Sequence, residues 1–232
     1  MSWVPPSTFV EKLKRLFFSP RQELDRIVAR ELRKGETEIH LLPQLVDPTR
    51  IAIDVGANRG VWTRQMAALC PEVHAFEPNP KIFAILDAAR PANAVTYPLA
   101  LSDRDGGSSL YVPRSARGYS NQRATLVPDQ QPGVETGVVD VETVRLDDLD
   151  LPPCGFIKID VEGMEMQVLA GLSGVLERAR PVMMAEVDNA VEADFLAWVT
   201  AQGYALFATH QRYRLNKNHL ICDAGDLDRL TE

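Results

Sequence analysis

The stretch IAIDVGANRG, residues 51–60, decides the fold. Its apolar, β-branched first half is typical of a buried strand, and its second half is a tight turn built on Gly56 and Gly60. The spacing D-x-G-x-N-x-G differs from the G-x-G-x-x-G of dinucleotide-binding turns, which disfavours a nicotinamide enzyme. Asp54 suits an amino-bearing ligand better than a pyrophosphate, and Asn58 tolerates the left-handed backbone that such turns need. We expect this turn to hold a ligand at the start of the following helix.

Short strands and helical periods alternate on the C-terminal side of this turn. The alternation predicts an α/β fold with a mostly parallel sheet and helices on both faces. More than fifty residues between the third and the fourth strand lack a helical period, and 108–112 and 138–146 have strand patterns. We interpret this segment as a β-hairpin insertion between strands 3 and 4 that covers a site. The predicted strands are 51–55, 73–77, 95–100, 156–161, 181–187, 204–210 and 219–222, and the predicted helices are 60–69, 80–89, one around 168–176, and 191–202.

The first 46 residues have a different pattern and are predicted to form an N-terminal helical cap, residues 1–46, on a main domain of residues 47–232. Apolar residues recur on one face of a helix over 9–17, and a second helix is expected over 22–34. We expect the amphipathic helix to dock on its own domain or on a second subunit, which would give a homo-oligomer. The basic residues beside its apolar face leave contact with a membrane surface as an alternative.

The composition is that of an ordinary globular protein, with 45% apolar and 25% charged residues. A net charge of −7 argues against general binding of nucleic acid. No apolar run approaches the roughly 20 residues of a transmembrane segment, and charges within residues 11–15 argue against a signal peptide. Three widely spaced cysteines are typical of reduced thiols, so we expect a cytoplasmic protein.

Acidic side chains end several predicted strands, and the carboxyl ends of parallel strands meet at one edge of a sheet. Glu77, followed by Pro78, can accept hydrogen bonds from a ribose diol, and we expect it to be ionised at neutral pH. Ser102 and Asp103 lie beside apolar residues that suit an adenine. These turns together predict a slot for S-adenosylmethionine, an adenosine that carries an amino-acid tail. The acids at the strand ends are Asp54, Glu77, Asp103, Asp160 and Glu186.

Several of these motifs occur together in a known family. The run KIDVEG at 158–163, followed by Glu165 and Leu169, is the most specific, and it is joined by 54–60, FEP at 76–78, 100–103 and VRLDDL at 144–149. Over about residues 40–223 the chain resembles the FkbM-type S-adenosylmethionine-dependent methyltransferases. The resemblance implies a Rossmann-like, seven-stranded class I methyltransferase sheet and O-methylation of a sugar, glycan or natural-product hydroxyl. The predicted cofactor-binding residues are Asp54, Gly56, Asn58, Gly60, Glu77, Pro78, Ser102, Asp103 and Asp160.

Methylation of a hydroxyl is assisted by a base that takes its proton. Asp160, at the end of a strand that faces the predicted slot, is our first candidate, with Glu162 and Glu186 in reserve. A rival interpretation makes Asp160, Asp188 and Asn189 ligands of a magnesium ion. We predict no metal, because Asp188 and Asn189 are also typical of a helix cap.

Two other functions remain open at this stage. The chain could methylate an amine, which needs less help from a base, or bind S-adenosylmethionine without catalysis. Intact acids at the strand ends argue against the second. His210 and His219 flank the last two strands, and a structural role is expected for both.

The predicted insertion carries three arginines in an otherwise acidic chain, Arg114, Arg117 and Arg123. Tyr119 and Asn121 lie among them and suit the faces and hydroxyls of a sugar. Because Arg makes paired contacts to carboxylate or phosphate, we predict an acceptor with a negative group, such as a uronic acid, a phosphorylated glycan or a nucleotide-linked sugar.

Overall fold

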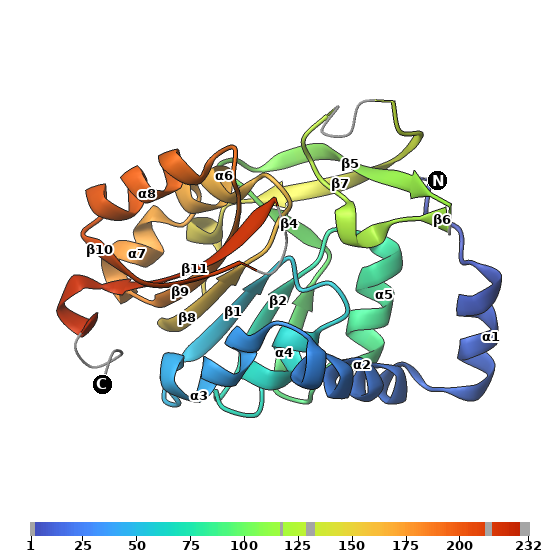
Figure 1. Ribbon diagram of the computed structural model, residues 1–232, viewed down its shortest axis with the longest axis horizontal. Helices are drawn as coiled ribbons and strands as arrows, with labels where there is room; N and C mark the ends of the chain where they lie inside the picture. Colours follow the sequence, from blue (N-terminus) through green and yellow to red (C-terminus); the bar gives the residue numbers. More distant parts are fainter. Residues whose placement is uncertain (1–2, 117, 129–132, 212–214, 228–232) are drawn as a thin grey trace.

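The computed structural model describes residues 3–116, 118–128, 133–211 and 215–227. Seven strands form one sheet in the order β10-β11-β9-β8-β1-β2-β3, which confirms the predicted fold class (Figure 1). From β1 the chain moves outward to β2 and β3, then returns to β8 on the other side of β1 and continues to β9. The strand order therefore reverses between β1 and β8, the place where open α/β sheets bind ligands. The bounds are β1 (Ile51–Val55), β2 (Val73–Phe76), β3 (Ala94–Tyr97), β8 (Cys154–Ile159), β9 (Val182–Asp188), β10 (Tyr204–His210) and β11 (Asn216–Asp223).

Strands β3, β2, β1, β8 and β9 are parallel, whereas β11 lies antiparallel between β9 and β10. All five residues of β1 are buried, as expected for a central strand covered on both faces. Ile53 belongs to a core cluster with Leu169 and Phe195, while its neighbour Ala52 belongs to a second cluster with Trp62.

Helices cover the sheet on both faces (Figure 1). One layer contains α6 (Glu165–Ala170), α7 (Ser173–Ala179) and α8 (Glu192–Ala201), and the other contains α2 (Pro20–Lys34), α3 (Leu42–Leu45), α4 (Val61–Met66) and α5 (Pro80–Ala89). Helix α1 (Phe9–Phe17) lies at the edge of the molecule. Ile39 and Leu42, from the predicted cap, pack in the same cluster as the sheet. Within the described part of the chain, we find no helix with the length and apolarity that crossing a membrane requires.

The segment between β3 and β8 forms a second sheet in the order β4-β7-β5-β6. Strand β5 pairs antiparallel with β7, and β4 pairs parallel with β7. The bounds are β4 (Leu99–Leu101), β5 (Gly106–Ser115), β6 (Gly118–Tyr119) and β7 (Thr136–Val144). The same segment contains the short 3-10 helices η2 (Asn121–Arg123) and η3 (Leu146–Asp148), and two others lie elsewhere in the chain, η1 (Thr37–Leu41) and η4 (Ala224–Asp226).

Two predicted elements are interrupted in the structure. The strand expected over 95–100 divides at Pro98 into β3 and β4, which lie at the edges of different sheets. Proline has no backbone N–H to donate, so the ladder of hydrogen bonds is interrupted there. The helix expected around 168–176 divides at Gly171 into α6 and α7. A Cβ at Gly171 would lie 1.9 Å from the carbonyl oxygen of Ser102, so this close approach of two segments requires glycine.

Candidate functional site

A cavity of about 610 Å³ opens where the strand order reverses, at the carboxyl ends of β1, β2, β8 and β9. Its volume is within the range of sites that hold cofactor-sized ligands. The second sheet contributes one wall and the main sheet the other. The lining residues are Glu36, Val55, Gly56, Asn58, Phe76, Glu77, Pro78, Leu99, Ala100, Leu101, Leu110, Asn121, Arg123, Ala124, Thr125, Leu126, Asp160, Val161, Glu162, Met164, Glu186, Asp188, Leu215 and Asn216.

The turn after β1 has the left-handed backbone that its residue types predicted. Gly56, Asn58 and Gly60 have φ of +77°, +50° and +86°. A Cβ at Gly56 would lie 1.9 Å from the carbonyl oxygen of Asp160, so the ends of β1 and β8 meet only without a side chain there. The backbone N–H groups of Gly56 and Ala57 both donate to the carbonyl oxygen of Phe76, at 3.0 and 2.9 Å, which ties the turn to β2.

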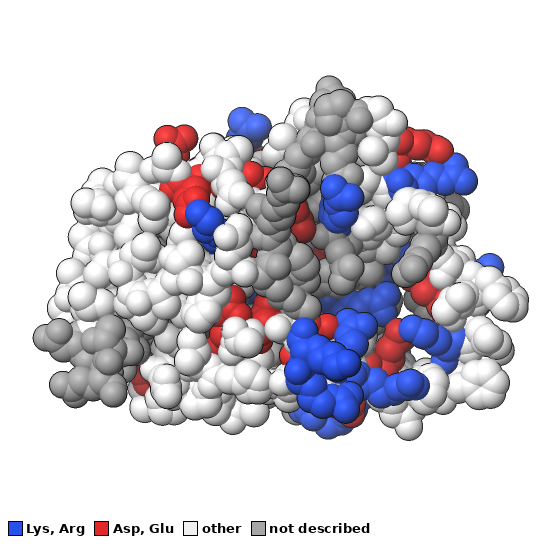
Figure 2. Space-filling model, in the orientation of Figure 1, with Lys and Arg blue, Asp and Glu red and all other residues white. Residues whose placement is uncertain are grey.

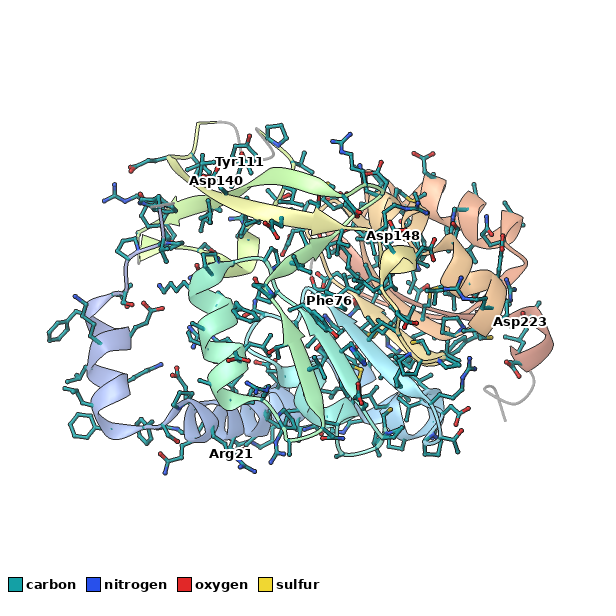
Figure 3. The ribbon with its side chains drawn as sticks, turned by 180° about the vertical axis from the view of Figure 1, so that it is seen from behind. Arg21, Phe76, Tyr111, Asp140, Asp148 and Asp223 are labelled. Atoms are coloured by element: carbon teal, nitrogen blue, oxygen red, sulfur yellow. The ribbon has the colours of Figure 1, made fainter. Side chains whose placement is uncertain are left out.

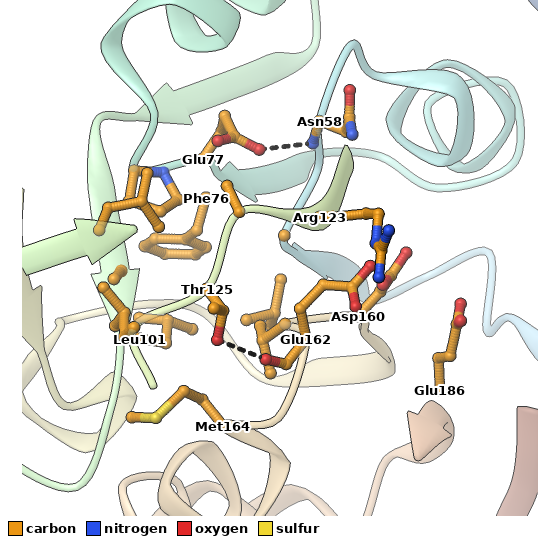
Figure 4. Close-up of a pocket in the computed structure, with 18 of the residues that line it drawn as sticks. Asn58, Phe76, Glu77, Leu101, Arg123, Thr125, Asp160, Glu162, Met164 and Glu186 are labelled. Atoms are coloured by element: carbon orange, nitrogen blue, oxygen red, sulfur yellow. Dashed lines mark hydrogen bonds between the residues drawn. The ribbon is translucent and has the colours of Figure 1, made fainter. Parts of the chain in front are cut away.

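Glu77 is held by two backbone groups at the floor of the cavity. One carboxylate oxygen accepts the N–H of Asn58 at 2.9 Å (Figure 4). The other accepts the N–H of Asn79 at 2.9 Å. Burial raises the pKa of Glu77 to about 7, although both hydrogen bonds oppose the shift. The expectation of full ionisation at neutral pH is therefore wrong, because that expectation ignored desolvation.

The predicted cofactor residues divide into two groups in the structure. Gly56, Asn58, Glu77, Pro78 and Asp160 line the cavity. Four others do not line it. They are Asp54, Gly60, Ser102 and Asp103.

Each of these four has a structural place instead. Asp54 is fully buried beneath the turn and accepts a hydrogen bond from the hydroxyl of Thr63 at 2.5 Å. Gly60 precedes the first residue of α4, and Ser102 is buried with its hydroxyl donating to the exposed Asp103 at 3.1 Å. The reason is geometric: Asp54 points into the helix layer, and β4 leaves the main sheet before it reaches Ser102.

The three predicted catalytic acids, Asp160, Glu162 and Glu186, all line the cavity (Figure 4). Asp160 forms a 2.8 Å ion pair with the buried ammonium of Lys158. Glu186 accepts a hydrogen bond from the side-chain amide of Asn216 at 2.8 Å, and its pKa is raised to about 7 by burial and by Asp160.

Glu162 has a backbone conformation that is rare for a residue with a side chain, with φ of +51°. Strained residues of this kind occur at functional sites. Burial, Asp160 and Glu186 raise its pKa to about 8, while the guanidinium of Arg123 opposes the rise. Figure 4 shows the Arg123 guanidinium beside the carboxylates of Glu162 and Asp160.

The insertion reaches the main sheet through a few hydrogen bonds. The hydroxyl of Thr125 donates to the carbonyl oxygen of Glu162 at 2.7 Å, and the amide of Asn79 donates to Asn121 at 3.0 Å. The segment that carries Arg123 is thus placed over the ends of β2 and β8.

Only part of the predicted acceptor set reaches the cavity. Arg123 and Asn121 line it. Arg114 forms an exposed ion pair with Glu135 at 2.7 Å, and Tyr119 packs edge-on against Trp3 with ring centroids 4.9 Å apart. Arg114 and Tyr119 are therefore placed away from the cavity, and Arg117 lies outside the described residues.

The magnesium alternative receives no support from the geometry. Asp188 lines the cavity, and its carboxylate accepts the backbone N–H of Ala190 at 2.8 Å in a local turn. It does not cap α8, because the N-cap of that helix is Val191 and has no side-chain hydrogen bond. Asn189 does not line the cavity. Among the residues that the structure places, no group of three or more His, Cys, Asp and Glu could hold a metal ion. His219 is buried beside Glu192, outside the cavity, at 3.3 Å.

Sequence reasoning missed several lining residues. Glu36 comes from the N-terminal segment, far from any motif, and accepts a hydrogen bond from the indole N–H of Trp62 at 2.8 Å. Phe76 and Leu126 add apolar wall, and Asn216 comes from the last strand. Of these four residues, only Phe76 had a signal in the sequence, because it lies in the FEP motif that we assigned to Glu77 and Pro78 alone.

Comparison with known proteins gives a consistent result. The family model described as the methyltransferase FkbM domain matches residues 54–213. Hexuronic acid methyltransferase AglP of Haloferax volcanii is 29% identical over 174 residues, which are 70% of this chain and 66% of that protein, just under two thirds of its length. The 31-O-demethyl-FK506 methyltransferase FkbM of Streptomyces tacrolimicus is 29% identical over 200 residues, which are 69% of this chain and 75% of that protein.

A solved structure has the same fold. Methyltransferase FkbM from Methylobacillus flagellatus superposes with a TM-score of 0.54 at 14% identity, covering 75% of this chain and 44% of that chain. Because the family model matches more than half of the chain, and its match includes both the turn after β1 and the KIDVEG run, the protein belongs to the methyltransferase FkbM domain family.

Proposed function

We propose that this protein is an S-adenosylmethionine-dependent O-methyltransferase acting on a hydroxyl of a sugar, glycan or natural product that carries a negative group. Membership of the FkbM family supports the methyl donor and the reaction class. The relatives, named for a hexuronic acid and for demethyl-FK506, support the acceptor class. The observation that carries the proposal is a cavity that combines the Glu77 floor with Glu162 and Arg123 at one end.

The cavity residues fit the cofactor in three parts. Phe76 and Leu101 offer apolar surface for an adenine, and Glu77 offers carboxylate oxygens for a ribose diol. The glycine turn leaves room for backbone contact, and Asp160 offers a negative charge for an amino group. When bound, S-adenosylmethionine supplies an electrophilic methyl group, so the protein mainly has to orient the acceptor and remove its proton.

Glu162 is the base in this proposal. A base acts best when its pKa lies near the working pH, and the pKa of Glu162 is raised to about 8. Asp160, our first candidate from the sequence, is already paired with Lys158. Its proposed role is therefore to hold charge beside the cofactor, with Glu186 as the second acid that raises the pKa of Glu162. A raised pKa favours a hydroxyl acceptor, since an amine needs less help from a base.

Arg123 is proposed to bind the negative group of the acceptor. Transfer of labelled methyl groups to a uronate-containing oligosaccharide and to its neutral counterpart tests this. We expect a lower KM for the uronate, and we expect Arg123→Gln to raise that KM about tenfold or more, the scale of a hydrogen bond between charged groups. The KM for the neutral sugar and the Kd for S-adenosylmethionine should stay unchanged.

The matched control is Arg114→Gln, because Arg114 belongs to the same insertion but faces Glu135. It should leave every constant unchanged. Equal KM values for charged and neutral acceptors in the unaltered enzyme would refute the anionic acceptor alone. Calorimetry that detects NAD but no S-adenosylmethionine would refute the whole proposal.

A further inference from the structure

Helix α1 exposes an apolar face to solvent, which inverts the usual arrangement of a surface helix. Five large apolar side chains of α1 are exposed, with exposed fractions of 79% for Phe9, 59% for Val10, 45% for Leu13, 78% for Leu16 and 71% for Phe17. At about 100° per residue they span an arc of roughly 120°. An exposed patch of this kind on an ordered helix marks an interaction surface.

The opposite face of α1 holds the helix on the protein. Glu11 forms a 2.9 Å ion pair with the buried Lys81 of α5 and lies 3.7 Å from Arg59. Thr8 and Glu11 form a capping box at the start of the helix, and Lys81 also donates to the carbonyl oxygen of Pro6 at 3.1 Å. Because the polar face of α1 contacts the rest of the protein, its apolar arc faces solvent.

Positive charge surrounds this arc. Lys12 and Lys14 are exposed, and on a helical wheel they lie at its two borders. The neighbouring helix α2 adds exposed basic residues at i, i+4, i+7 and i+8, and Figure 2 shows Lys and Arg gathered over α2. The basic residues of that row are Arg26, Arg30, Arg33 and Lys34.

The charge is local to this end of the chain. Residues 1–34 contain eight Lys and Arg against four Asp and Glu, a net charge of +4, whereas the whole chain has a net charge of −7. Figure 3 shows α1 at the edge of the molecule, with Arg21 of α2 below it. An apolar arc with basic borders on an outward-facing helix is the pattern of helices that lie in the interface of anionic membranes.

We infer that α1 and the basic face of α2 bind the surface of an anionic lipid bilayer, with the apolar arc of α1 inserted among the lipids. A second copy of this chain is the competing occupant. A symmetric dimer through the same face would bring two positively charged surfaces together, which opposes association. The lipid surface supplies both the apolar phase and the negative charge.

Sedimentation with lipid vesicles tests the inference in the full chain. We expect binding to vesicles of phosphatidylcholine mixed with phosphatidylglycerol, little binding to phosphatidylcholine alone, and weaker binding as salt rises. Leu13→Ser, Leu16→Ser and Phe17→Ser combined should reduce the affinity at least about tenfold, because the inserted apolar area is removed. Arg26→Gln, Arg30→Gln and Arg33→Gln combined should reduce the preference for anionic lipid.

The matched control combines Val138→Ser with Leu206→Ser, two exposed apolar residues elsewhere on the surface. It should bind vesicles like the unaltered protein, and thermal melting should show that every variant is folded. Absence of binding to the anionic vesicles, equal binding to both vesicle types, or undiminished binding of the apolar variant would each overturn the inference. A dimer in sedimentation velocity that the apolar variant dissociates, without vesicle binding, would assign the face to a second copy.

Discussion

Glu162 combines a left-handed backbone, a half-buried side chain and three acidic neighbours. Each feature alone has a structural explanation, but together they place a carboxyl group with a raised pKa in the cavity beside Arg123. The hydroxyl of Thr125 donates to the carbonyl oxygen of Glu162 and so links the proposed base to the insertion. The insertion therefore both brings Arg123 to the cavity and anchors Glu162, the proposed base.

The pH dependence of methyl transfer tests the role of Glu162. A base must be deprotonated to act, so kcat/KM should rise with pH until about 8, the pKa of Glu162, and then level off. Glu162→Gln should lower turnover about 100-fold and abolish this rise of kcat/KM with pH.

Glu165→Gln is the control for that profile. The pKa of Glu165 is also raised to about 7, but its carboxylate accepts the N–H of Gly163 at 2.8 Å and does not line the cavity. This variant should still show the rise of kcat/KM with pH. If Asp160→Asn abolishes the rise and Glu162→Gln leaves it intact, the base is Asp160 and not Glu162.

At the scale of elements, the site depends on how closely the ends of β1 and β8 approach each other. Gly56 touches the backbone of Asp160, and the same turn is hydrogen-bonded to β2 through Phe76. The ends of three strands thus meet at one glycine, so the position of this turn is coupled to that of Asp160.

Gly56→Ala should therefore affect both folding and binding. The added Cβ meets the carbonyl oxygen of Asp160, and φ of +77° is strained for alanine. We expect a loss of about 2 kcal/mol or more in the free energy of unfolding, and weaker binding of S-adenosylmethionine. Thermal unfolding and calorimetry measure the two effects.

Gly107→Ala is the matched control, because no atom lies within 4 Å of the Cβ position at Gly107. It should melt and bind like the unaltered protein. If Gly56→Ala behaves in the same way, the close approach of β1 and β8 is not what shapes the cavity.

At the scale of the whole molecule, the fold concentrates carboxyl groups with raised pKa values at one edge of the sheet. The pKa of Glu162 is raised to about 8, and those of Glu77, Glu165 and Glu186 to about 7. In each case burial is the largest cause. The folded protein is therefore more stable when these carboxyl groups are protonated than when all of them are charged.

Stability should therefore fall as the pH rises. A carboxyl whose pKa is higher in the folded than in the unfolded protein binds more protons when folded, so deprotonation above its ordinary pKa of 4.5 costs stability until about pH 8. The pKa values of His74 and His219 are lowered by burial, which costs stability only as the pH falls through 6.5. The melting temperature should thus decline between pH 6.5 and 8, by about 2–4 °C for each kcal/mol lost.

Melting curves across this range, with Glu162→Gln as the comparison, check the prediction. The variant lacks one titrating group and should show a shallower decline. A melting temperature that is constant or increases from pH 6.5 to 8 would show that the acids are not desolvated as described.

Local patterns were enough to predict much of the fold. β1 lies where its apolar run predicted it, and the left-handed turn at Gly56 follows from residue types that tolerate that backbone. The alternation of strands and helices predicted the sheet, because buried parallel strands and amphipathic helices each have a period that the sequence displays directly. The motifs at 76–78 and 158–163 identified the family, which the match to residues 54–213 confirms.

The sequence by itself thus determined the class of fold, the family and the strand ends at which the site forms. Only the tertiary structure decided which side chains share the cavity: Glu36 enters it, Asp54 is buried beneath it, and of Arg114 and Arg123 only Arg123 reaches it. The physical reason is that a period in the sequence specifies one element at a time. Distances between side chains, and the desolvation that raises the pKa of Glu77, arise only when segments far apart in the chain pack together.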